Sequence, residues 1–303
     1  MKKVLVIVGP TAVGKSDFGV SCAKLFNGEI ISGDSIQVYK GFDIGSGKIT
    51  NEEKENIIHH MIDIKDPTDN YSVFEFQQKS RVLIDEITER GKLPIIVGGT
   101  GLYIKACLYD YVFDKQEVVD TSEYDKLTNE ELHKLLEDKD FDTSKKIHIN
   151  NRKRIIRALV IANTNKVTKS ENLKQQKHEM LYDAMIIGCT TNRDKLYENI
   201  NLRVEKMFEN GLVEEIDFLL TKVNFDNQAM QGIGYREFKG YYNNEYDLAK
   251  TKQLIQTHSR QFAKRQYTWF KNQMDVNWVD LKVDEKGTLE LIRNWSNNGN
   301  SNN

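Results

Sequence analysis

Short runs of aliphatic and β-branched residues alternate along the chain with stretches in which apolar residues recur every three or four positions. This alternation is typical of a parallel sheet wrapped by helices. The runs predict buried strands at Val4–Val8, Glu29–Ser32, Leu93–Val97 and Ala184–Cys189. The expected fold class is therefore α/β.

The helical pattern is clearest in four segments. Helices are predicted directly after Gly14 and over Val73–Arg90, Arg193–Asn210 and Asp247–Phe270. In the last of these an apolar residue returns every seven positions, at Leu248, Ile255, Phe262 and Trp269. Residues at this spacing share one face of a helix, so we expect this face to pack on the core.

The segment 112–184 has a different character. Charged and polar residues dominate it, glycine is absent and the pattern is mostly helical. We predict a helical insertion domain at 112–184 that contacts a macromolecular partner. It interrupts a catalytic core formed by 1–111 and 185–295. The end, 296–303, contains only Ser, Asn and Gly and is predicted to be a disordered tail.

Composition narrows the class of protein. With 39% hydrophobic residues among 303, the chain should bury a sizeable core. Lys and Arg number 43 against 45 Asp and Glu, a net charge of −2, which argues against a globally basic nucleic-acid coat protein but leaves room for a local basic face.

The cysteines and the N-terminus indicate a cytoplasmic protein. Cys22, Cys107 and Cys189 are scattered, so neither a disulfide framework nor a zinc site is expected. No apolar run reaches the roughly 20 residues of a membrane span. Val4–Val8 is short for a signal peptide and runs into Gly9-Pro10 without a cleavage site.

The first predicted strand leads into a phosphate-binding motif. The residues that fit G-x-x-x-x-G-K-[ST] are Gly9, Pro10, Thr11, Ala12, Val13, Gly14, Lys15 and Ser16. The glycines let backbone N–H groups face phosphate oxygens, and the following helix adds the positive end of its dipole. Lys15 supplies a charge and Ser16 a hydroxyl for Mg²⁺. The motif predicts a P-loop, polyphosphate-binding protein, and by itself it indicates ATP binding.

The other strand ends bear on which polyphosphate binds. P-loop NTPases hold Mg²⁺ with an aspartate at the end of a buried strand. Here Leu93–Val97 runs into Gly98-Gly99-Thr100-Gly101 with no acid, which weakens the case for an ATPase. Ligands of open α/β sheets bind outside the carboxyl ends of the strands, so the P-loop, Asp34 and Thr100 are expected to converge.

Two further residues each allow two interpretations from the pattern alone. Asp34, before Ser35, is either a turn or helix-cap residue or a general base beside a bound diphosphate. Arg203 falls on the apolar face of its predicted helix, so it either pairs with an anion or reaches out from the edge of that face to water or an internal salt bridge.

Several motifs, in order along nearly the whole chain, resemble those of the bacterial tRNA dimethylallyltransferases (the IPP transferase family). They are Gly9–Ser16, Ser32–Gly45, His59–Asp63, Val97–Tyr103, Arg154–Leu159, Gly232–Glu237 and Arg260–Phe270. The resemblance implies a P-loop-like parallel sheet with helices around it. It also implies transfer of the dimethylallyl group from dimethylallyl diphosphate to N6 of adenosine-37, beside the anticodon of tRNAs that read codons beginning with U.

The resemblance also implies residue roles. The P-loop would bind the diphosphate together with Mg²⁺ on Ser16, and Asp34, Thr100 and Arg203 would be catalytic. The residues expected to contact tRNA are Asp34, Ser35, Ile36, Gln37, Lys153, Arg154, Arg157, Gly232, Gly234, Tyr235, Arg236, Lys264, Arg265, Gln266 and Lys271. The expected partners are the tRNA anticodon stem-loop and dimethylallyl diphosphate, with no membrane and with the protein as a monomer.

Charge supports an RNA partner independently of the resemblance. From Lys250 to Lys271 the chain has six Lys or Arg residues and no Asp or Glu. The plainer interpretation of this stretch is a basic helix face that is merely solvated. For Tyr235 and Arg236, the alternative to a contact with tRNA is a structural turn.

Three other functions remain to be weighed. An ATP-dependent small-molecule kinase would suit the P-loop alone, but the acid-free strand end counts against it. A non-catalytic nucleotide-binding RNA module is disfavoured by Asp34 beside the P-loop. Prenyl transfer to free adenine nucleotides would need neither the basic faces nor the insertion.

Overall fold

The computed structural model describes residues 1–111, 113, 120–164 and 178–298. The chain folds as two compact units. The core unit comprises Met1–Tyr109 and Met180–Asn303, and the inserted unit comprises Asp110–Glu179.

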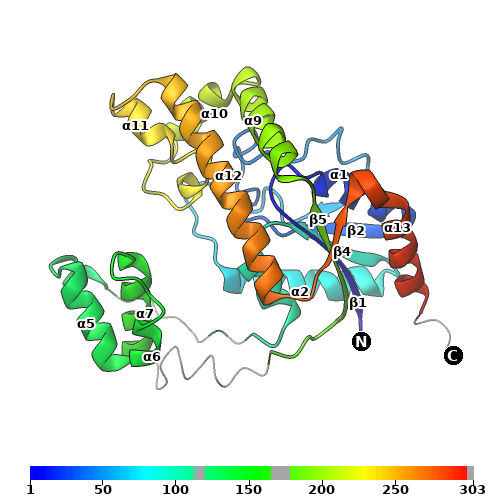
Figure 1. The fold of residues 1–303 in the computed structure, drawn as a ribbon, viewed down its shortest axis with the longest axis horizontal. Helices are drawn as coiled ribbons and strands as arrows, with labels where there is room; N and C mark the ends of the chain where they lie inside the picture. Colours follow the sequence, from blue (N-terminus) through cyan, green and yellow to red (C-terminus); the bar gives the residue numbers. More distant parts are fainter. Residues whose placement is uncertain (112, 114–119, 165–177, 299–303) are drawn as a thin grey trace. The chain divides into compact units, whose positions relative to one another are not determined.

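Among the described residues, the core unit contains a six-stranded parallel sheet in the order β3-β2-β4-β1-β5-β6 (Figure 1). The strands are β1 Lys3–Val8, β2 Gly28–Ser32, β3 His59–His60, β4 Leu93–Gly98, β5 Asp183–Thr190 and β6 Asn277–Asp280. β1 is central: Val6 lies opposite Ile96 of β4 and Ile186 of β5. The four predicted strands and the α/β class are confirmed, whereas β3 and β6 were not predicted.

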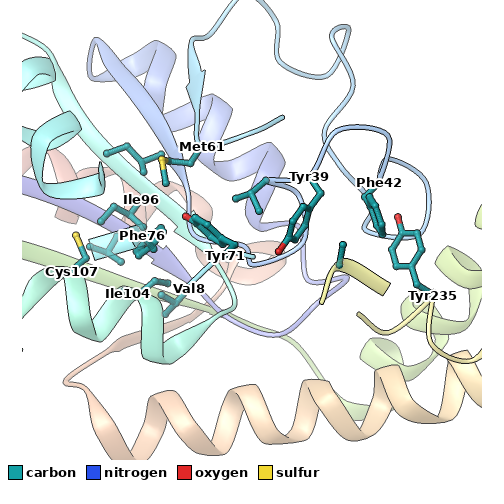
Figure 2. Packing of buried hydrophobic residues seen from close by; sticks show 14 of the residues in the cluster. Val8, Tyr39, Phe42, Met61, Tyr71, Phe76, Ile96, Ile104, Cys107 and Tyr235 are labelled. Atoms are coloured by element: carbon teal, nitrogen blue, oxygen red, sulfur yellow. The ribbon is translucent and has the colours of Figure 1, made fainter. Parts of the chain in front are cut away.

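Side chains of β1 alternate between the two faces of the sheet, as the pleat requires. Val4, Val6 and Val8 join the core that contains α2 Val73–Glu89 and α3 Gly101–Leu108, and Figure 2 shows part of this packing around Val8. Leu5 and Ile7 join the core on the other face, with α1 Lys15–Leu25 and α13 Leu281–Asn297. The sheet therefore lies between two helical layers.

Further helices of the core unit follow β5. They are α9 Arg193–Glu209, α10 Leu212–Leu220, the 3₁₀ turn η1 Ala229–Gln231, α11 Phe238–Tyr242 and α12 Leu248–Gln273. The long helix α12 begins where Asp247 caps it, its Oδ1 atom accepting from the Lys250 N–H at 2.8 Å. This helix packs on α9, α11 and α3, and Figure 1 shows it running past the sheet.

The inserted unit is helical in its described part, as predicted. Its helices are α4 Ser122–Asp125, α5 Asn129–Lys139, α6 Phe141–Ser144 and α7 Arg152–Thr164. A capping box starts α5: the Thr128 hydroxyl accepts from the Glu131 N–H, and the Glu131 carboxylate accepts from the Thr128 N–H. Leu132 and Leu136 of α5 and Ile155 of α7 form its small apolar core.

The insertion ends earlier than the predicted 184. The Leu181 N–H donates to the Leu108 carbonyl at 2.8 Å, and the Asp183 N–H donates to the Lys2 carbonyl at 3.0 Å. The Asp183 carboxylate then accepts from Lys3 and from the Trp295 indole. These distant partners let a polar segment join the sheet. Val112, the predicted start, lies outside the described residues.

The predicted tail 296–303 is wrong at its start. Ser296 and Asn297 complete α13, where the Ser296 hydroxyl donates to the Arg293 carbonyl at 2.9 Å. A serine whose hydroxyl bonds to the preceding turn is tolerated at a helix end, so composition alone misjudged these two residues. Residues 299–303 lie outside the described part of the chain.

Two other sequence expectations can be compared with the described residues. Cys22, Cys107 and Cys189 are all buried free thiols. In the described part of the chain, no helix is both long and apolar enough to span a membrane.

Candidate active site

A cavity of about 540 Å³ opens in the core unit at the carboxyl ends of β1, β2 and β4. One side, here called the strand wall, is formed by the residues that follow these strands: Thr11, Lys15, Ser16, Asp34 and Thr100. A second set of lining residues, here called the helix wall, contains Gly45–Gly47, Arg203 of α9 and Phe262, Arg265 and Gln266 of α12. The predicted convergence of the P-loop, Asp34 and Thr100 is thus present.

The P-loop follows β1 directly. Gly9 and Gly14 have φ angles of 143° and 88°, which glycine adopts without strain. A Cβ atom on Gly9 would lie 2.4 Å from the Cys189 carbonyl oxygen of the neighbouring strand. α1 then begins at Lys15, so its unpaired N–H groups and positive dipole end face the cavity.

Lys15 is the charged group of this loop. Its Nζ atom donates to the Pro10 carbonyl at 2.5 Å and lies within electrostatic range of Asp34 and Arg203. Burial lowers the pKa of Lys15 to about 8, despite the opposing effect of Asp34. The charged form of an amine that is desolvated in this way is strongly stabilised by an anion beside it.

Asp34 takes part in the turn after β2, which is one of the two interpretations that the sequence left open. Its Oδ1 atom accepts from the N–H groups of Ile36 at 2.7 Å and Gln37 at 3.2 Å, so one oxygen fixes the turn after β2. Among the described residues no hydrogen bond to Oδ2 is present. One carboxylate therefore holds its own position and keeps one oxygen available to a ligand.

Thr100 stands at the end of β4, where an NTPase would carry its magnesium-binding acid. It is the residue before α3, and its hydroxyl makes no capping bond. The strand ends in Gly98, and neither Gly99 nor Thr100 is acidic. The side chain of Thr100 lines the cavity, so its hydroxyl can bond a ligand.

Arg203 lies on α9 and reaches the cavity beside Gly47. Its Nη2 atom donates to the carbonyls of Ser46 at 3.2 Å and Gly47 at 3.4 Å. Burial lowers the pKa of Arg203, and Asp34 opposes that effect. No carboxylate in the described part of the chain forms an ion pair with this guanidinium, which favours an anionic ligand over an internal salt bridge.

Gln266 does not lie where a surface tRNA contact would. Its Oε1 atom accepts from the Thr11 N–H at 3.0 Å, and its Nε2 atom donates to the Gly99 carbonyl at 3.0 Å. The residue is buried, with 7% of its surface exposed. Both polar ends of its side chain tie the P-loop to the end of β4, and because the residue also lines the cavity, its contact with tRNA stays a prediction.

Besides Asp34 and Arg236, four of the residues predicted to contact tRNA line the cavity from the turn after β2 and from the loop after η1. They are Ser35, Ile36, Gln37 and Gly232. Arg236 is exposed at the same cavity, and its Nε atom donates to the Glu237 carboxylate at 2.9 Å. A flipped base that entered this cavity could meet these groups.

Tyr235 and Gly234 are corrected to structural residues. Tyr235 is fully buried, its ring centroid 4.7 Å from that of Phe42 (Figure 2). Gly234, with φ 99°, packs so closely that a Cβ atom would lie 2.9 Å from the Gly45 carbonyl oxygen. The structural turn, the alternative given for Tyr235 and Arg236, therefore describes the buried Tyr235 and not Arg236, which is exposed at the cavity.

The remaining predicted RNA contacts are exposed. Lys264, Arg265 and Lys271 lie on the solvent side of α12, with Arg265 also lining the cavity. Lys153, Arg154 and Arg157 lie exposed on α7 of the inserted unit. Both sets are accessible to a polyanion.

Phe262 was expected to pack into the core but lines the cavity instead. It is 36% exposed, and the Arg265 guanidinium lies 5.8 Å from its ring centroid. An aromatic ring with an arginine over it at a cavity edge is suited to stacking a base. The signal in the sequence that this turn of α12 faces a ligand is the absence of Asp and Glu from Arg260–Lys271.

The fit of Mg²⁺ depends on oxygen donors. Ser16 is exposed at the first turn of α1 and lines the cavity with Asp34. Within the described residues there is no group of three or more His, Cys, Asp or Glu that could hold a metal alone. Few protein ligands are normal for Mg²⁺, which keeps water and binds substrate phosphates. The residues thus fit a magnesium ion shared with a diphosphate.

The sequences of known proteins match this chain over most of its length. A family model described as IPP transferase matches residues 37–273. A tRNA dimethylallyltransferase of Bacillus cereus (strain G9842) is 48% identical over 298 residues, covering 96% of this chain and 94% of the relative. One of Bacillus anthracis is 47% identical over 298 residues, covering 96% and 95%.

Solved structures match as well. A tRNA delta(2)-isopentenylpyrophosphate transferase from Staphylococcus epidermidis has a TM-score of 0.74 and 42% identity, covering 98% of this chain and 99% of that one. A eukaryotic dimethylallyltransferase acting on tRNA has a TM-score of 0.86 and 28% identity, covering 98% and 80%.

Proposed function

The chain belongs to the IPP transferase family, and from this premise we propose that it transfers a dimethylallyl group from dimethylallyl diphosphate to tRNA. The proposed acceptor is N6 of adenosine-37, in tRNAs that read codons beginning with U. The observation that carries the proposal is one cavity that joins an anion site, at Lys15 and Arg203, to an Asp34 carboxylate oxygen that accepts no hydrogen bond from the described residues.

The diphosphate is proposed to lie between the two walls. The N-terminus of α1 and Lys15 approach it from the strand wall, and Arg203 approaches it from the helix wall. When the carbon–oxygen bond of the substrate breaks, negative charge develops on the departing diphosphate. Donors fixed at that place stabilise the charge as it forms, which lowers the barrier.

Asp34 is proposed as the general base. The exocyclic amine of adenine is a poor nucleophile, because its lone pair is delocalised into the ring. As its nitrogen forms the new bond to carbon, the Asp34 carboxylate accepts one N–H proton and diphosphate leaves. The hydrogen bonds from Ile36 and Gln37 keep this carboxylate oriented while its other oxygen reacts.

Thr100 and Mg²⁺ complete the proposed site. The Thr100 hydroxyl, which caps no helix, is placed to bond either the diphosphate or the amine. Ser16 would hold Mg²⁺, and the ion when bound would neutralise charge on the diphosphate. The protein is proposed to work as a monomer.

The tRNA is proposed to bind through its anticodon stem-loop. A base in a loop can be turned out, stacked and read on its edges. Phe262 and Arg265 at the cavity edge suit the stacked base, while Lys264 and Lys271 on the same helix suit phosphates. The exposed basic residues of α7 in the inserted unit offer a second phosphate-binding surface.

A small-molecule kinase is disfavoured. It would share the P-loop, but β4 ends in glycine without an acid, and the relatives named above are prenyltransferases. The sheet end where such a kinase would hold its metal carries Thr100 instead.

One assay separates these functions. Unmodified tRNA is incubated with the protein, dimethylallyl diphosphate and Mg²⁺, and in parallel with ATP in place of the prenyl donor. We expect a gain of one dimethylallyl group on adenosine-37 in the first reaction only, detected by mass spectrometry of nucleosides. Phosphate release from ATP without prenylation would refute the proposal.

A further inference from the structure

The loop Asp43–Gly47 contacts Arg203 through its carbonyl groups, and its N–H groups have other partners. Glu215, the fourth residue of α10, directs its carboxylate at this loop. Its Oε2 atom accepts from the N–H groups of Asp43 at 3.0 Å and Ile44 at 2.6 Å, and its Oε1 atom accepts from Gly45 at 3.0 Å. Three successive backbone donors thus converge on one carboxylate.

Tyr235 completes this arrangement. Its hydroxyl accepts from the Ser46 N–H at 2.9 Å and donates to the Glu215 Oε1 atom at 2.8 Å. Burial, and after it the Glu215 carboxylate, raises the pKa of Tyr235 well above its usual value, so the hydroxyl remains a donor. Phe42 packs against the Tyr235 ring, which fixes it beside the start of the loop (Figure 2).

The loop is held at very close range. A Cβ atom on Gly47 would lie 1.7 Å from the Nη2 atom of Arg203, and one on Gly45 would lie 2.6 Å from the Tyr235 ring. A shift of the loop away from Glu215 would therefore alter the place of the Arg203 guanidinium, which bonds its last two carbonyls.

The same loop reaches the turn that contains Asp34. The Gly47 carbonyl also accepts from Gln37 Nε2 at 3.3 Å, and the Gln37 N–H donates to Asp34 Oδ1 at 3.2 Å. Glu215 is thus connected, through one short loop, to the arginine of the helix wall and to the carboxylate of the strand wall.

We propose that Glu215 and Tyr235 are positioning residues that hold the loop Asp43–Gly47 so that Arg203 points at the diphosphate. Neither residue touches the cavity, so they act through the loop. The inference rests on the proposed function only in its choice of ligand, and it can be tested with inorganic diphosphate alone.

The test uses Glu215→Gln, which replaces one acceptor oxygen by an NH₂ group facing backbone N–H donors. We expect the affinity for inorganic diphosphate with Mg²⁺, measured by calorimetry, to fall roughly tenfold or more, because donors of a charge-assisted network are left unpaired. In prenylation assays the KM for dimethylallyl diphosphate should rise, whereas tRNA affinity should stay within about twofold of wild type.

A matched control and a milder variant accompany it. Glu214→Gln makes the same charge change one residue away, at an exposed side chain, and should bind diphosphate like wild type. Tyr235→Phe keeps the ring and the three hydrogen bonds from backbone N–H groups to Glu215. We therefore expect the affinity for diphosphate to fall only about threefold. If Glu215→Gln fails to fold, as judged by circular dichroism, Tyr235→Phe provides the same comparison.

A double-mutant cycle decides whether the effect passes through Arg203. In an Arg203→Met background, Glu215→Gln should cause little further loss of diphosphate affinity, because the guanidinium it positions is gone. Losses that simply multiply would overturn the proposal, as would unchanged affinity in Glu215→Gln. A wild-type protein that binds diphosphate but does not prenylate tRNA would instead refute the proposed function and leave this inference standing.

Discussion

The two walls of the cavity are built in different ways. In the strand wall, polar groups are set by neighbours in sequence: Asp34 bonds the N–H groups two and three residues on, and Lys15 bonds the carbonyl five residues back. In the helix wall, Arg203 bonds a loop 157 residues away, and Gln266 bonds the P-loop across 255 residues. The strand wall is therefore a product of local motifs, and the helix wall is a product of packing.

This difference bears on how each wall responds to change. A substitution in the strand wall removes a group from a backbone that the sheet still holds. A substitution at Arg203 acts on a network whose members come from α9, α10 and the loop Asp43–Gly47. We therefore expect the loss of Asp34 to act on the chemical step, whereas the loss of a cation from either wall acts on diphosphate binding.

The largest expected effect is at Asp34. Asp34→Asn keeps an oxygen for the turn but removes the base, so we expect kcat to fall by about 10²- to 10⁴-fold while tRNA affinity stays near wild type. Single-turnover prenylation and filter binding measure the two quantities. Asp69→Asn, which changes an exposed turn carboxylate, is the control. Equal loss of tRNA binding in Asp34→Asn would make this residue a binding group.

The next effect compares the walls directly. Lys15→Met and Arg203→Met each remove one positive charge from the anion site, and each should weaken diphosphate binding and lower kcat/KM by about 10²- to 10³-fold. Lys206→Met, at an exposed position of α9, should behave like wild type. Wild-type activity in Arg203→Met would show that the helix wall takes no part in diphosphate binding.

The affinity for diphosphate should depend on pH through Lys15, in the strand wall. The pKa of Lys15 is lowered to about 8, so below this pH the amine is charged and above it the amine becomes neutral. We expect diphosphate affinity, relative to Lys15→Arg, to fall about tenfold per pH unit above pH 8. Binding near pH 9 should also take up a proton, visible in calorimetry with buffers of different ionisation enthalpy. A flat ratio between the two proteins would contradict this.

The smallest expected effect is at Gln266, whose side chain bonds both the P-loop and the end of β4. Gln266→Ala removes two hydrogen bonds, to Thr11 and to Gly99, and should raise the KM for dimethylallyl diphosphate about fivefold to tenfold. Gln261→Ala, exposed on the same helix, serves as its control. If Gln266→Ala instead weakened tRNA binding alone, Gln266 would be a tRNA contact and not a support of the P-loop.

How far the sequence predicts the site can be read from particular residues. The P-loop and Asp34 were found because glycine spacing and a strand end restrict a local backbone, and Arg203 was suspected because a charge stood on an apolar helical face. Glu215 carried no such signal, since a glutamate in the first turn of a helix is ordinary. The internal hydrogen bonds of Tyr235 and Gln266 could not be predicted, because a motif gives no information on which side of a helix or turn becomes buried.

The α/β sheet, the phosphate-binding loop and the order of the strand-end residues can be predicted from the sequence. These features depend on the period of apolar residues and on the backbone freedom of glycine, both of which act over a few residues. The folded chain was needed to show that Glu215 bonds the loop which supports Arg203, and that Gln266 bridges the P-loop and β4. Such contacts join distant segments, and their energy is gained only when the whole core has packed.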